Sequence, residues 1–139
     1  MVQLAKRRSI MDTSSHDMLW ATYVGAAEEL EREGLFGEAE HVLQNALNDA
    51  RELGEVDRRL INSLHSLAER YYKRGRYERA EELYRQVLSL RASVLGASHE
   101  DIADSIERLA GLLRHTRRDM EASTIELQAR TFENRFYSA

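Results

Sequence analysis

The sequence predicts an all-α protein, built as a right-handed superhelical stack of three antiparallel helix pairs. Proline is absent and only 7 of the 139 residues are glycine, which disfavours folds rich in tight turns. Apolar residues recur at helical spacing along most of the chain. Alanines repeat at intervals of 41 and 42 residues, and a period in this range indicates stacked helical units that bury a core between neighbours. These alanines are Ala27, Ala68 and Ala110 in the first helices and Ala39, Ala80 and Ala122 in the second helices.

The first 14 residues are expected to form a flexible leader (1–14), ahead of a single domain at residues 15–137. Lys6, Arg7 and Arg8 form a basic cluster there, and no apolar periodicity is sustained. A block of like charges can also serve as an interaction arm. A docking or localisation role is therefore the alternative to a solvated tail.

The first repeat is predicted within residues 17–54. Ser14, Ser15 and Asp17 can cap its first helix, because their side-chain oxygens accept hydrogen bonds from the free N–H groups of the first turn. The inward stripe of that helix is Trp20, Tyr23, Ala26, Ala27 and Leu30. Gly34 ends the helix as a left-handed C-cap. The stripe of the second helix is Phe36, Ala39, Val42, Leu43, Ala46 and Leu47.

The second repeat, residues 57–95, has the clearest pattern. A helix that opens near Asp57 directs one stripe inward, composed of Leu60, Ile61, Leu64, Leu67, Ala68 and Tyr71. Gly75 interrupts the spacing, and a second helix runs from Tyr77 to about Val94. Its stripe is Tyr77, Ala80, Leu83, Tyr84, Val87 and Leu88. The small side chain of Ala80 lets the two helices pack closely.

The third repeat, residues 99–137, has the weakest pattern. Gly96 breaks the preceding helix, and Ser98 can cap the next one. The stripe of that helix is Ile102, Ile106, Leu109, Ala110, Leu112 and Leu113. The segment HTRRD (115–119) is expected to form the turn. The last helix carries Ala122, Ile125, Ala129, Phe132 and Phe136, whose spacing is that of a heptad-like seam.

Composition limits the classes of function. Hydrophobic residues are 42% and charged residues 32% of the chain, which suits a helical-repeat protein. The net charge of -4 argues against a general nucleic-acid binder, which needs a basic surface. No apolar run approaches the roughly 18–20 residues of a membrane span. The absence of cysteine excludes disulfides and thiolate sites, and a cytoplasmic location is the expectation.

No arrangement of residues predicts catalysis, a metal site or a cofactor, so the protein is not expected to be an enzyme. The histidines are His16, His41, His65, His99 and His115. None belongs to an HExxH motif. Glu81 and Glu82 are adjacent on a helix and point about 100° apart, so they cannot share a substrate. His65 and His115 are expected to be ordinary surface histidines, with a pH-sensitive contact in a groove as the alternative.

These repeats resemble the tetratricopeptide repeat family, whose pattern is large-x2-Leu-small-x2-Tyr followed by Ala-x3-aromatic. The second repeat matches it with Leu64, Leu67, Ala68, Tyr71, Ala80 and Tyr84. The first repeat offers Tyr23, Ala26, Ala27, Leu30, Ala39 and Leu43. The third offers Ile106, Leu109, Ala110, Leu113, Ala122 and Glu126, so its final aromatic residue is replaced. The period and the segment VLGASHEDIA (94–103) are most similar to repeats of the kinesin light chain type, although the usual prolines of that linker are missing.

The resemblance implies an adaptor or scaffold whose first helices line a concave groove for a peptide or helix of a partner protein. The implied groove residues are Glu28, Glu31, Asn62, His65, Ser66, Glu69, Tyr72, Lys73, Arg108, Arg114 and His115. Others that map to the same side are Ala21, Val24, Arg32, Asp104, Glu107 and Gly111. The groove would be acidic in the first repeat and more basic in the third, and such a gradient would orient an elongated partner. The same residues could instead form a solvated helix face.

Two specialised functions of the family fit this sequence poorly. Family members that hold a chaperone's C-terminal carboxylate use Lys, Asn and Arg at positions that are Val24, Glu28, Ser66, Asp104 and Arg108 here. Only Arg108 has the required character. The paired asparagines that precede Leu-Ala in kinesin light chain repeats are His65 and Ser66 here, so cargo-peptide binding of that type is not implied.

Self-assembly is the alternative function. Phe132, Phe136 and Tyr137 lie on the last helix, which in such an array has one side without a neighbour. They either fold back onto the preceding helix, or pack against another copy of the chain or a missing neighbour. Packing against another copy would make the protein a homo-oligomeric scaffold.

Overall fold

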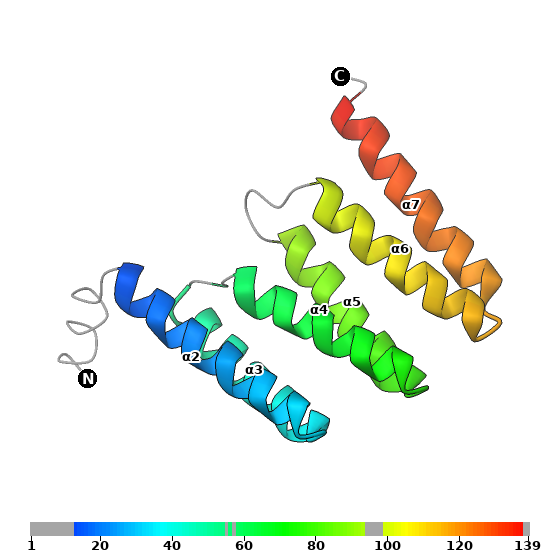
Figure 1. Cartoon of the computed structure of the whole chain (residues 1–139). Coiled ribbons are helices and arrows are strands. Elements are labelled where there is room, and N and C mark those ends of the chain that lie inside the picture. Colours follow the sequence, from blue (N-terminus) through cyan, green and yellow to red (C-terminus); the bar gives the residue numbers. More distant parts are fainter. Residues whose placement is uncertain (1–12, 55, 57, 94–98, 138–139) are drawn as a thin grey trace. The chain divides into compact units, whose positions relative to one another are not determined.

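The computed structural model describes residues 13–54, 56, 58–93 and 99–137; within these ranges the side chains of residues 13–17, 99 and 132–137 are left undescribed. All regular structure in this part of the chain is helical (Figure 1). The helices are α2 (Thr13–Arg32), α3 (Phe36–Glu52), α4 (Arg58–Lys73), α5 (Tyr77–Ser93), α6 (His99–His115) and α7 (Asp119–Tyr137). The predicted all-α repeat fold is confirmed.

The chain divides into two compact units, with the boundary inside α4 between Leu64 and His65. In the first unit, α2 and α3 pack against each other. Trp20, Leu43 and Leu47 are buried in its core. The hydroxyl of Tyr23 donates a hydrogen bond to Asp49 Oδ2 at 3.2 Å, which links the two helices at their surface.

The second unit contains the C-terminal half of α4 together with α5, α6 and α7. Helix α6 packs against α5 and against α7, so it is the central element of the unit. The core residues of this unit are Leu67, Ala68, Tyr71, Ala80, Leu83, Tyr84, Val87, Leu90, Leu109, Ala110, Leu112, Leu113 and Ala122. Every one of them except Leu90 was placed on an inward stripe by the sequence.

The six alanines that define the period are all buried, with exposed fractions of 0–1%. Each lies on the face where its helix meets a neighbour, and a methyl group permits a closer approach of two helices than a larger side chain does. The sequence period is therefore a period of close helix contacts.

The three turns inside the helix pairs share one hydrogen-bond pattern. In the first, the N–H of Gly34 donates to the carbonyl of Glu31 at 2.9 Å, and the N–H of Leu35 donates to the carbonyl of Leu30 at 2.8 Å. This pair of bonds is the Schellman motif, which satisfies the last carbonyls of a helix. The second turn repeats it at residues 71–76 and the third at residues 113–118.

One residue in each turn has a positive φ, which is 80° at Gly34, 77° at Gly75 and 64° at Arg117. Glycine adopts this conformation without strain because it has no Cβ. Arginine does not, so the third turn keeps the geometry of the others at a cost in stability. The predicted C-cap role of Gly34 is confirmed.

An ion-pair cluster joins the third turn to α5. Arg118 pairs with Glu81 and with Glu121, and Arg85 donates to Glu81 at 3.0 Å. Although burial acts in the opposite direction, hydrogen bonds from these two arginines hold the pKa of Glu81 below its ordinary value. The glutamate is therefore ionised, and it aligns the start of α7 with α5.

Two sequence expectations differ from the structure. Helix α2 begins at Thr13, so Thr13 and Ser14, assigned to the leader, are helical, and the expected caps Ser14, Ser15 and Asp17 lie inside the helix. Ala26 is exposed rather than inward, because the buried stripe of α2 is narrower than its run of apolar residues. The other leader residues, Asp57 and Ser98 lie outside the described residues.

Replacement of Arg117 by glycine should stabilise the second unit by about 1 kcal/mol, because it removes the cost of a left-handed arginine. The matched opposite change, Gly75→Ala, should destabilise by a similar amount. A Cβ at Gly75 would meet nothing within 4 Å, so this change tests backbone strain alone. Urea unfolding followed by circular dichroism measures both. A less stable Arg117→Gly variant would contradict the strain argument.

Candidate functional site

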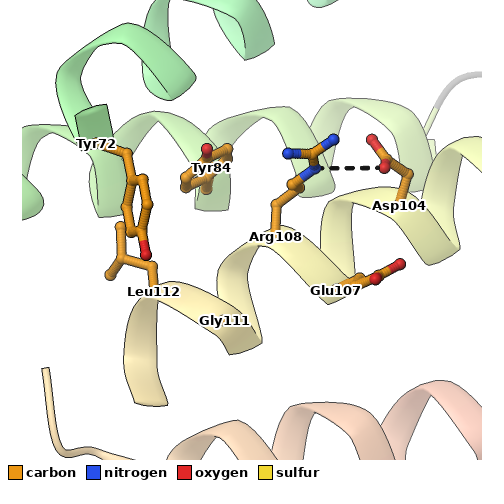
Figure 2. Close-up of a pocket in the computed structure, with 7 residues that line it drawn as sticks. All are labelled: Tyr72, Tyr84, Asp104, Glu107, Arg108, Gly111 and Leu112. Atoms are coloured by element: carbon orange, nitrogen blue, oxygen red, sulfur yellow. Dashed lines mark ion pairs between the residues drawn. The ribbon is translucent and has the colours of Figure 1, made fainter. Parts of the chain in front are cut away.

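A hollow of about 390 Å³ opens on the second unit between α4, α5 and α6 (Figure 2). Tyr72 comes from α4, Tyr84 from α5 and Arg108 from α6. Gly111 contributes no side chain, which leaves space beside Leu112. The complete lining is Tyr72, Tyr84, Asp104, Glu107, Arg108, Gly111 and Leu112.

Arg108 is held by two carboxylates from different helices. Its Nη1 atom lies 3.4 Å from Glu69 Oε1 on α4, and its Nε atom lies 3.5 Å from Asp104 Oδ1 on α6. The negative charge of Glu69, followed by that of Asp104, raises the pKa of Arg108. The guanidinium therefore stays charged, and its charge is balanced by two carboxylates of the protein itself.

His65 contacts the same two carboxylates, those of Glu69 and Asp104. It is only 8% exposed, so the expectation of a surface histidine is wrong. Its Nε2 atom is 3.0 Å from Glu69 Oε1 and 3.4 Å from Asp104 Oδ2, whereas Nδ1 has no hydrogen-bond partner among the described residues. The ring also packs edge-on against Tyr84, with centroids 5.7 Å apart. Burial, and then the charge of Arg91, lower the pKa of His65, against the opposing effect of Glu69 and Asp104.

Arg91 fixes α6 to α5 behind the hollow. Its Nη1 atom donates to Ser105 Oγ at 2.7 Å and to the carbonyl of Asp101 at 3.1 Å, and it lies 3.7 Å from Asp104 Oδ2. Arg91 is 8% exposed and Ser105 is fully buried. Hydrogen bonds to a charged group are worth about 1.5–3 kcal/mol, so this contact sets the position from which Asp104 and Arg108 reach the hollow.

Three polar groups that line the hollow have no partner among the described residues: the hydroxyls of Tyr72 and Tyr84 and the carboxylate of Glu107. Tyr84 is 3% exposed, and burial raises its pKa to about 12. Its hydroxyl therefore stays protonated and can both donate and accept. Glu107 is exposed and offers a carboxylate at the rim.

An aromatic cluster adjoins the hollow near the turn of the second repeat. The Tyr77 hydroxyl and His115 Nε2 are hydrogen-bonded at 2.9 Å. Tyr72 packs edge-on against both rings, with centroid distances of 5.5 Å to Tyr77 and 5.7 Å to His115. These contacts fix the orientation of the Tyr72 ring.

In the second unit, the structure brings five of the implied groove residues together in two groups. His65, Glu69 and Arg108 form the ion network, and Tyr72 and His115 form the aromatic cluster. Ser66 and Lys73 are exposed. Arg114 instead pairs with Glu126 of α7, which replaces the aromatic residue at the end of the repeat pattern.

The remaining implied groove residues belong to the first unit. Glu28 and Asn62 are exposed. Glu31 is buried, with an exposed fraction of 7%. Sequence reasoning missed the hollow's Tyr84, which it assigned to the core, and the buried Arg91–Ser105 contact. The pattern held no signal for the latter, because an arginine and a serine at these positions also suit a solvated helix.

Neither a metal-ion site nor a membrane-spanning helix is present in the described ranges. No group of three or more His, Cys, Asp or Glu side chains there is placed to hold a metal ion. None of the described helices combines the length and apolar character needed to cross a membrane.

The repeated helix pairs define a helical-repeat protein. Residues 60–101 match the family model described as tetratricopeptide repeat, and these residues contain the repeat with the clearest sequence pattern. The predicted resemblance to this family is confirmed. Repeats of this kind generally mediate protein–protein interactions. The sequence has no significant match among the curated proteins.

Solved structures share the fold. BtubC (BKLC) from P. vanneervenii matches with a TM-score of 0.64 and 17% identity over 91% of this chain and 52% of that one. A Podosopora anserina protein, described as a kinesin light chain with nearly identical TPR-like repeats, matches with a TM-score of 0.55 and 22% identity. That match covers 92% of this chain and 59% of the other. The chain thus spans between half and three-fifths of these proteins.

The stability of the second unit should fall as the pH drops below 6.5, the ordinary pKa of histidine. The pKa of His65 is lowered on folding, so the unfolded chain binds the proton more tightly. The stabilisation is therefore fully present above pH 6.5, and it is lost as the pH falls from 6.5 to the folded-state pKa. Urea unfolding at a series of pH values measures this dependence.

His65→Gln should weaken the dependence of the free energy of unfolding on pH, in the interval between neutral pH and the acidic range where carboxylates titrate. If the wild-type protein and His65→Gln lose stability in parallel on acidification, His65 is not the group responsible.

Proposed function

We propose that this chain is a protein-interaction adaptor that binds a peptide or helix of a partner over the face formed by α4 and α6 in the second unit. The observation that supports it most is the hollow, which combines two tyrosines and a leucine with three polar groups that lack partners within the described part of the chain. Binding sites typically join apolar surface with a few directed polar groups.

The size of the hollow suits side chains of a partner. Its volume of about 390 Å³ is near the lower end of the ~300–1,000 Å³ range of small-molecule pockets. Tyrosine and arginine are also the residue types enriched at the energetic centres of protein interfaces. The fixed ring of Tyr72 would lose little conformational freedom on binding, which favours affinity.

The ion network argues against capture of a C-terminal carboxylate. Of the five positions that such a clamp would use, only the one occupied by Arg108 has the required character, and Arg108 is paired with Glu69 and Asp104. A partner's carboxylate would have to displace one of these, or share the guanidinium with both. The surface therefore favours recognition through aromatic and hydrogen-bonding contacts.

Gly111→Phe should fill the hollow and reduce capture of partner proteins at least tenfold, the effect of about 1.4 kcal/mol. A Cβ at this position would meet nothing within 4 Å, so the helix should be retained. Gly37→Phe, at an equally open glycine of α3, is the matched control. Affinity capture from lysate of the source cells, with mass spectrometry, compares the three baits. Partners retained equally by Gly111→Phe and the wild type would place the binding elsewhere.

Self-association through α7 is a second candidate, supported by its outer face. Met120 is 87% exposed and Leu127 is 63% exposed, and residues seven apart lie on one side of a helix. In contrast, Ala122 of the predicted seam is buried and Ile125 and Ala129 are half-buried, in keeping with the packing of α7 on α6. The side chains of Phe132, Phe136 and Tyr137, proposed for self-association, lie outside the described residues.

If α7 mediates self-association, the double change Met120→Ser and Leu127→Ser should shift the protein to monomer, because it removes the exposed apolar surface of this face. Sedimentation velocity over a range of concentrations measures the distribution. Met18→Ser, at an exposed methionine of α2, is the control. A wild-type protein that stays monomeric at high concentration would eliminate this candidate.

A further inference from the structure

We propose that the hollow on the second unit accepts a basic side chain, lysine or arginine, of the partner. This inference rests on the proposed function, because it names the chemistry of the segment that the same surface binds.

The lining has an excess of negative charge. It contains two carboxylates, from Asp104 and Glu107, and one guanidinium, from Arg108. The charge of Arg108 is already met by Asp104 and by Glu69, 3.5 and 3.4 Å away. Glu107 has no ion-pair partner among the residues that the structure describes, so its carboxylate is available to a cation.

The tyrosines supply the other contacts that a cation needs. The Tyr84 hydroxyl belongs to a side chain that is 3% exposed, and within the described ranges it has no hydrogen-bond partner. Its oxygen and that of Tyr72 can accept N–H bonds from an ammonium or guanidinium group. A cation over the face of a tyrosine ring also gains about 0.5–2 kcal/mol, and Tyr72 is held in place by Tyr77 and His115.

Other occupants fit less well. An acidic side chain would meet the carboxylates of Asp104 and Glu107 and would find Arg108 already paired. A purely apolar side chain would cover the Tyr84 hydroxyl without supplying a partner, and an unsatisfied buried polar group is unfavourable. A basic side chain satisfies these groups at once, and its aliphatic stem can lie along Leu112.

A randomised peptide display library, selected on the wild-type protein and depleted on Gly111→Phe, tests this inference. The expected result is a set of Gly111-dependent peptides with lysine or arginine enriched at one position. Gly111-dependent peptides with an acidic or apolar residue there would overturn the inference and leave the proposed function standing. Failure to recover any Gly111-dependent peptide would overturn both.

Variants of the protein then locate the cation. Glu107→Gln should weaken the selected peptide about tenfold, as expected for one charge-assisted hydrogen bond, and Glu107→Lys should weaken it further. Glu78→Gln, at an exposed glutamate of α5, is the matched control. Replacement of the basic residue of the peptide by glutamine should cause a similar loss. Equal affinities for Glu107→Gln and Glu78→Gln would show that Glu107 does not bind the cation.

Discussion

Close helix packing at buried alanines is the constraint on which the rest of the structure depends. Ala68, Ala80 and Ala110 are fully buried on α4, α5 and α6, and α6 packs against α5 and α7. Larger side chains at well-packed positions typically cost about 1–3 kcal/mol. Because α6 is held this closely, Asp104 and Arg108 reach the side chains of α4, and the hollow forms where Gly111 leaves the surface open.

The sequence predicted the local features of this fold well. The alanine period and the apolar stripes located the helices, and Gly34 and Gly75 located two of the turns, because helix spacing and positive φ depend mainly on nearby residues. Burial of His65 was not predicted. It depends on Tyr84 and Asp104, which are distant in sequence, and a histidine beside a serine on a polar helix face gives no sign of either. The same holds for the contact between Arg91 and Ser105.

The second and third repeats differ where recognition is proposed. Tyr72 and Tyr84 line the hollow of the second repeat, and the residues one period later are Arg114 and Glu126, which pair with each other. The two positions that hold tyrosines in the second repeat are thus occupied by an ion pair in the third. The turn differs in the same way, with Arg117 at the position of Gly75. The repeats keep their packing residues and vary the residues proposed to face a partner, and such variation is how one fold supports different binding surfaces.

The most direct test of this account is an NMR measurement of intermolecular NOEs between the chain and a peptide selected for binding to it. The account predicts NOEs from one peptide side chain to the ring of Tyr72 and the methyl groups of Leu112, with none to the methyl groups of Leu127 on the outer face of α7. NOEs to Leu127, without contacts to Tyr72 or Leu112, would contradict the assignment of the hollow as the binding site.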